Sequence, residues 1–148
     1  MAISPDVIGT STPPVTVTIE RGPLQLFAKA TGQTDPLYTD VEIAWAQGHP
    51  DLPVPPTFLF GIELSQPDPF GWITDLGVEL NTVLHGAQTF RYSSPTHAGD
   101  ILTAQSTITN VYSKKEGALE FIERRTDVTR DGMPVATLEG TTVVRHLS

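Results

Sequence analysis

Hydrophobic and polar residues alternate along four stretches in the second half of the chain. Residues 88–92, 101–112, 119–130 and 133–145 are rich in Thr, Val, Ile, Phe and Tyr, and turn-forming residues lie between them. A period of two is typical of strands. The Asp131-Gly132 step between the last two stretches favours a tight hairpin turn. The pattern therefore predicts a long antiparallel meander.

The first half of the chain follows a different pattern. Residues 15–19 alternate as one short strand, and residues 20–31 and 41–47 have the apolar spacing of short helices, each with a glycine placed to end it. Residues 55–66 begin with two prolines, which suit a first helical turn, and are apolar around most of the circumference. Because a helix that is apolar nearly all round is a buried helix, we predict a buried central helix here.

Together these elements predict one α+β domain over residues 1–148. The length suits a single core. Strands of about a dozen residues are longer than usual and must curl strongly, so the concave face of the sheet has room for the apolar helix. The proline and glycine clusters are read as turns within this one domain, because no repeat, charge run or low-complexity tract separates two parts.

Composition narrows the function classes. The formal net charge of −8 and the pI of about 4.7 oppose non-specific binding to nucleic acid or to an anionic membrane surface. The absence of cysteine excludes disulfides, thiolate metal sites and cysteine nucleophiles. The first residues show no signal-peptide pattern, and no apolar run is long enough to cross a bilayer. We expect a cytoplasmic protein without a metal.

Three stretches, in order along the chain, resemble the MaoC-like dehydratase family, in its fatty-acid-synthase type I-like N-terminal branch. They are Ala-Thr-Gly-Gln-Thr-Asp-Pro-Leu-Tyr at 30–38, Val-Pro-Pro-Thr-Phe at 54–58, and Leu-His-Gly-Ala-Gln-Thr-Phe at 84–90 followed by Pro-Thr-His-Ala-Gly-Asp at 95–100. The resemblance covers nearly the whole chain and implies a hot-dog fold, a curled sheet around a central helix. It also implies (R)-specific hydration or dehydration of acyl thioesters.

The resemblance also exposes a departure in the loop that carries catalysis. Active relatives have Gly-Asp-x-Asn-Pro-x-His, and aligning Gly32 and Pro36 places Gln33 at the Asp and Tyr38 at the His. The reaction needs groups that titrate near neutrality, whereas Gln does not titrate and Tyr has an ordinary pKa near 10. We therefore assign no catalytic residue. No cofactor is expected, apart from the coenzyme A or acyl carrier protein that carries the substrate.

Candidate substrate-binding residues follow from the same resemblance. They are Gln33, Asp35, Tyr38, Pro56, Thr57, Gly61 and His85. Each has a structural alternative: the loop residues as turn formers, Pro56 and Thr57 as a helix start, Gly61 as a close-packing position, and His85 as part of a strand. A helix N-terminus at Pro56 and Thr57 would polarise a thioester carbonyl.

Other polar residues carry weaker predictions. His97 is read as a solvated turn residue beside Asp100. Arg124 and Arg125 should point to opposite faces of one strand, where either meets a coenzyme A phosphate or is an exposed charge at the sheet edge. The four histidines lack metal-ligand spacing.

Three functions stay open on the sequence. The first is an acyl-thioester-binding subunit of an (R)-specific enoyl-thioester hydratase or 3-hydroxyacyl dehydratase, as a homodimer or as a heterodimer with a catalytic MaoC-like subunit. The second is a stand-alone hydratase or thioesterase, in which Glu63 or Asp35 activates water. The third is a non-enzymatic assembly module that keeps only the fold.

Overall fold

A computed structural model describes residues 2–146. The elements follow one another in the order η1 (Pro5–Val7), β1 (Val15–Thr18), α1 (Arg21–Ala30), η2 (Pro36–Tyr38), α2 (Val41–Ala46), η3 (Phe58–Ser65), α3 (Gly71–Thr74), η4 (Leu80–Thr82), β2 (Val83–Tyr92), β3 (Ile101–Lys114), β4 (Leu119–Arg130) and β5 (Met133–Arg145), where η denotes a 3-10 helix. No helix in this described range is long and apolar enough to cross a membrane.

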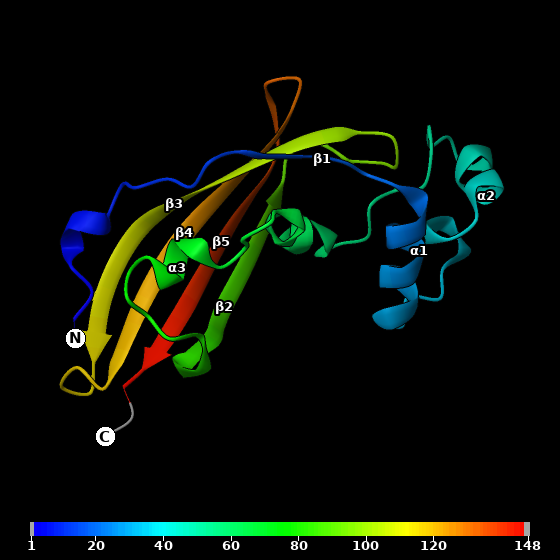
Figure 1. The fold of residues 1–148 in the computed structure, drawn as a ribbon. Helices are drawn as coiled ribbons and strands as arrows, with labels where there is room; N and C mark the ends of the chain where they lie inside the picture. The colour runs from blue at the N-terminus through cyan, green and yellow to red at the C-terminus, as the bar shows by residue number, and fades with distance from the viewer. Residues whose placement is uncertain (1, 147–148) are drawn as a thin grey trace.

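Five antiparallel strands form one curled sheet in the order β1-β3-β4-β5-β2 (Figure 1). The predicted meander is confirmed for β3, β4 and β5, which are neighbours in space as in sequence. The first of the four predicted stretches is wrong as part of the meander, because β2 pairs with β5 and not with β3. Asp131 (φ 52°) and Gly132 (φ 76°) both have positive φ at the β4–β5 turn, as the Asp-Gly signal predicts. Strand β2 begins at Val83 rather than at residue 88, so it is longer than the alternation indicated.

The central helix differs from its prediction in two ways. It is a 3-10 helix that begins at Phe58, after Thr57 in the left-handed conformation (φ 73°), so the two prolines precede the helix and do not form its first turn. It is also buried on one side only. Leu59 and Ile62 are 3% and 4% exposed, whereas Phe60 and Leu64 are 46% and 51% exposed. The chain alone therefore leaves half of this apolar helix uncovered.

The apolar core is divided into two clusters. The first lies beneath η3 and next to α1 and α2, and includes Leu102 and Ala104 of β3 and Val128 of β4; the second lies beneath α3 and includes Ile108 of β3 and Ile122 of β4. Strand side chains alternate between the two faces of the sheet, so every second residue of β3 and β4 faces inward. Between the two apolar clusters these inward positions hold the polar residues Ser106 on β3 and Arg124 and Thr126 on β4. The concave face is therefore interrupted by a polar belt.

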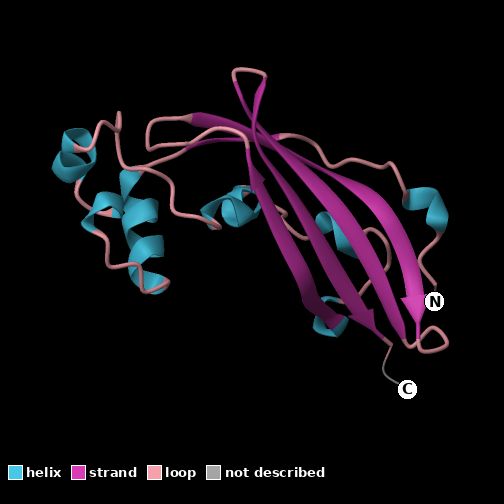
Figure 2. Cartoon of the chain, turned by 180° about the vertical axis from the view of Figure 1, so that it is seen from behind, coloured by secondary structure: helices cyan, strands magenta, loops and turns pink. Residues whose placement is uncertain are grey.

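Helices α1 and α2 lie beyond one end of the sheet, away from the β3–β4 hairpin (Figures 1 and 2). The loop that resembles the hydratase loop, residues 30–38, connects α1 to α2 through η2 and therefore also lies beyond this end of the sheet. Leu24 of α1 and Ala44 of α2 are fully buried and join the first core cluster. This packing fixes the position of the loop relative to the sheet.

Candidate functional site

Small side chains on the concave face leave room for a pocket. Thr126 of β4 and Gly140, Thr141 and Thr142 of β5 line a pocket of about 420 Å³ between the sheet, η3 and α3. Gly140 and Thr142 lie on the same face of β5 as the buried Leu138 and Val144, because strand side chains alternate. Larger side chains at Thr126, Gly140 and Thr142 would fill the space, because protein interiors pack to high density. The pocket is thus a consequence of side-chain size at a few strand positions.

The rim of the pocket is apolar and uncovered. Phe60, Leu64, Phe70, Leu80 and Leu84 all line it, and each is between 44% and 51% exposed. They are five of the eleven large apolar side chains that are exposed in the described part of the chain. Exposed apolar patches of this kind mark ligand-binding or protein-binding surfaces.

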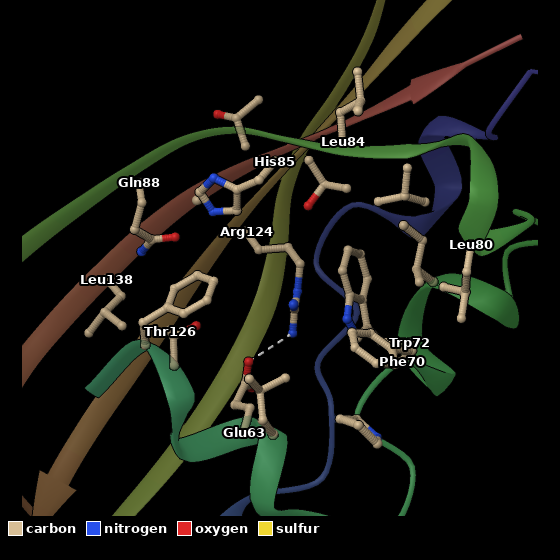
Figure 3. Close-up of a pocket in the computed structure, with 18 of the residues that line it drawn as sticks. Glu63, Phe70, Trp72, Leu80, Leu84, His85, Gln88, Arg124, Thr126 and Leu138 are labelled. Atoms are coloured by element: carbon tan, nitrogen blue, oxygen red, sulfur yellow. Dashed lines mark hydrogen bonds and ion pairs between the residues drawn. The ribbon is translucent and has the colours of Figure 1, made fainter. Parts of the chain in front are cut away.

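An ion pair lies at the floor of the pocket (Figure 3). Arg124 Nη2 donates to Glu63 Oε2 at 3.3 Å, and the two side chains are only 14% and 17% exposed. The Arg124 guanidinium carbon lies 3.8 Å from the centre of the Trp72 ring, close enough for a cation–π contact. Burial lowers the pKa of Arg124 below its ordinary value, while Glu63 acts in the opposite direction.

Glu63 is held from two sides. Its Oε1 accepts a hydrogen bond from the Ser106 hydroxyl at 2.6 Å, and the Thr126 hydroxyl lies within hydrogen-bonding distance of Ser106 in turn. Both carboxylate oxygens therefore have partners, which restricts Glu63 as a general base. Arg124 is on the interior strand β4 and faces the pocket, so the reading of it as an exposed sheet-edge charge is wrong. Arg125 does face outward, beside Asp127.

His85 is the one predicted substrate-binding residue that lines this pocket. Its ring meets the edge of Phe60 at 5.4 Å between ring centres, and Gln88 lies on the same wall. Residues three apart share a face here because the β2–β5 register shifts between His85 and Ala87. Gly86 is the extra residue, and a Cβ on it would lie 3.0 Å from the Thr141 carbonyl oxygen. The bulge therefore requires glycine.

The loop residues Gln33, Asp35 and Tyr38 do not line the pocket. Gln33 Oε1 accepts from the Asp35 backbone N–H at 3.1 Å, and Asp35 Oδ1 accepts from the Leu37 N–H at 3.0 Å, which caps η2. Within this chain these two side chains thus serve the turn. The assignment of Gln33, Asp35 and Tyr38 as substrate-binding residues stays a prediction.

Pro56, Thr57 and Gly61 also lie outside the pocket lining. The Thr57 backbone N–H donates to the Tyr92 hydroxyl of β2 at 3.0 Å, so the start of η3 is tied to the sheet edge. Gly61 is exposed, and a Cβ there would meet no atom within 4 Å. Close packing within this chain therefore does not explain Gly61. Its surface is open, like those of Phe60 and Leu64.

His97 is buried, contrary to the prediction of a solvated turn residue. It is 8% exposed, and its Nε2 lies 3.0 Å from Nδ1 of His49. Burial is the main cause that lowers the pKa of His97, and the neighbouring His49 adds to it. No group of three metal-ligand side chains occurs among residues 2–146.

Comparisons with known proteins add to this geometry. A family model described as "FAS1-like, dehydratase domain region" matches residues 6–138. A UPF0336 protein of Streptomyces coelicolor is 40% identical over 114 residues, which are 76% of this chain and 76% of that one.

Two solved structures are similar over nearly the whole chain. One is the C-terminally truncated HadBC (3R-hydroxyacyl-ACP dehydratase) complex of Mycobacterium tuberculosis, at 25% identity and a TM-score of 0.78, covering 93% of this chain and 97% of that chain. The other is a MaoC-like dehydratase, at 21% identity and a TM-score of 0.81, covering 94% of this chain and 42% of that longer chain. These likenesses confirm the predicted α+β hot-dog fold.

Proposed function

We propose a function for this chain on the premise that it belongs to the family of FAS1-like dehydratase domain regions. We propose that it binds the acyl group of an enoyl or 3-hydroxyacyl thioester, as the non-catalytic subunit of an (R)-specific hydratase or dehydratase. One observation carries the proposal: an apolar pocket with an uncovered rim lies beside β2, which has one edge without a partner strand among residues 2–146. The predicted placement of Gln33 and Tyr38 at the catalytic positions supports the non-catalytic role.

The pocket suits an acyl chain. Its rim consists of phenylalanine and leucine side chains, and burying each methylene of a ligand against such surface contributes about 0.8 kcal/mol. The polar side chains His85 and Gln88 also line the pocket, and an imidazole and an amide can both form hydrogen bonds with a thioester carbonyl or a hydroxyl group. The carrier, coenzyme A or acyl carrier protein, would remain outside.

A partner would supply the missing acid–base pair. In the described range, β2 pairs with β5 on one side and with no strand on the other. Its sequence contains no proline or lysine, the residues that commonly protect an edge from pairing. Leu84 on this strand belongs to the exposed pocket rim. A second hot-dog subunit pairing along β2 would cover the edge and rim together, and HadBC, by its name, is a complex.

The stand-alone enzyme is supported less well. Glu63 has both oxygens engaged by Arg124 and Ser106, and Asp35 caps a turn outside the pocket. Neither is placed to activate a water molecule against a substrate in the pocket. An assembly module without ligand would have no use for a pocket of this size and lining.

Hydration of crotonyl-CoA tests the proposal. The purified chain alone should be inactive. Mixed with a co-encoded hot-dog subunit that has an intact Gly-Asp-x-Asn-Pro-x-His loop, it should give activity that the partner alone lacks. Robust turnover by this chain alone would instead support the stand-alone enzyme. Failure of the mixture to exceed the partner alone would refute the subunit role.

A matched pair of variants locates the partner surface. Leu84→Glu places a charge on the pocket rim at a residue that is 44% exposed. Ile8→Glu introduces the same charge at a residue that is equally exposed, at 43%, but lies outside the pocket, near β3. Only Leu84→Glu should abolish complex formation in gel filtration. Equal loss with both variants would contradict pairing along β2.

A further inference from the structure

A second pocket lies directly behind the first. It has a volume of about 530 Å³ and is bounded by residues 10–13, the 66–68 loop, α3 and part of β3. Trp72 and Arg124 line both pockets, and no other described residue does. These two side chains, which we call the partition, therefore separate the two spaces.

The partition is held closed by contacts from three elements. Arg124 of β4 lies over the Trp72 ring of α3, and its Nη2 forms an ion pair with Glu63 of η3. Removing one member of a largely buried ion pair strongly destabilises a fold, because it leaves an uncompensated charge in the interior. An alkyl chain has no group that could replace either charge. The alkyl chain of the ligand would therefore end where the apolar walls of the first pocket meet the Glu63–Arg124 ion pair.

We infer that the Trp72–Arg124 partition sets the maximum length of the acyl group. The protein then binds only those acyl thioesters whose acyl group fits within the first pocket. This inference rests on the proposed acyl-binding function. The partition then prevents longer acyl groups from entering the second pocket. Its lining includes Ile108 and Leu76, which could contact an alkyl chain if Trp72 were smaller.

Binding of a homologous series tests the inference. Saturated acyl-CoAs from butyryl to palmitoyl are titrated calorimetrically into the protein, alone and with its hot-dog partner. Affinity should rise about fourfold for each added methylene while the chain is being buried, then stop rising at one length. In Trp72→Ala the rise should continue for at least two further methylenes. The two shortest members should keep wild-type affinity.

The chain offers a matched control. Trp45→Ala removes the other tryptophan, which is 51% exposed on α2 and does not line either pocket. It should keep the wild-type length limit. Trp72→Leu provides a milder opening, should Trp72→Ala fail to fold by circular dichroism.

Tryptophan fluorescence gives a measurement without altering the partition. In Trp45→Phe, Trp72 is the only tryptophan, because the sequence has two. Its emission should shift when acyl groups long enough to reach the floor bind, and stay unchanged with butyryl-CoA.

The possible failures are distinguishable. If no acyl-CoA of any length binds the wild type, alone or with partner, the proposed function is wrong. If the wild type binds with a length limit that Trp72→Ala and Trp72→Leu leave unchanged, or if Trp72 emission responds equally to every length, the acyl function stands and the partition inference is overturned.

Discussion

The one-sided burial of η3 makes a strong prediction about two neighbouring side chains. Ile62 and Leu64 are both aliphatic and lie on the same 3-10 helix, yet Ile62 is 4% exposed and Leu64 is 51% exposed. Ile62→Ala should lower the free energy of unfolding by about 2–5 kcal/mol, as large-to-small changes in packed cores do. That is a large share of the roughly 5–15 kcal/mol that stabilises a domain.

Leu64→Ala should behave differently. In the isolated chain only about half of Leu64 is buried, so Leu64→Ala should lower the free energy of unfolding by only about 1 kcal/mol. When a partner covers the exposed half of Leu64, that half contributes about 1 kcal/mol. The dissociation constant of the complex should therefore rise about fivefold in Leu64→Ala.

Urea unfolding separates the two effects. The midpoint should fall clearly for Ile62→Ala with an unchanged slope, which marks a change in stability and not in the unfolded state. Unfolding must be followed over a dilution series, because association raises apparent stability at high protein concentration. If Leu64→Ala lowers the midpoint as much as Ile62→Ala at the lowest concentration, the argument from one-sided burial is refuted.

Two further predictions concern pH and assembly. Because burial, assisted by His49, lowers the pKa of His97 in the folded state below its ordinary 6.5, the unfolded chain takes up this proton first as the pH falls. The free energy of unfolding should therefore decline as the pH drops from about 6.5 toward the folded-state pKa of His97. In His97→Gln, the urea midpoint should depend less on pH over this range. An unchanged pH profile in this variant would contradict the role of His97 in the decline. The chain should also not be a monomer when purified alone, because its β2 edge and apolar rim would be covered by a second copy; a species of about 16 kDa that persists across dilution in sedimentation experiments would show this to be wrong.

Local sequence rules account for most of the sheet. The alternation that predicts β3, β4 and β5 and the Asp131-Gly132 turn are properties of a few adjacent residues, so they can be recognised without the fold. The alternation predicts only residues 88–92 of strand β2, because Gly86 interrupts it. The reason for that glycine is the close approach of the Thr141 carbonyl oxygen, which belongs to a strand far away in the sequence.

The central helix shows what an apolar pattern in the sequence can predict and what it cannot. Apolar residues on all sides of residues 58–65 correctly indicate that the segment contacts the core, through Leu59 and Ile62. The pattern cannot say that a single chain covers only one side. That depends on the curvature and width of the sheet beneath the helix, which leave Phe60 and Leu64 exposed.

The sequence determined the fold family, because short motifs in a fixed order carry it, whereas the placement of Gln33 and Tyr38 at the family's catalytic Asp and His positions stays a prediction. The tertiary structure decided where chemistry is possible. Glu63, Trp72 and Arg124 are spread over three elements, and only the packing of η3 and α3 against β4 brings them together. Their proximity is a long-range property of the folded chain, and no local pattern encodes it.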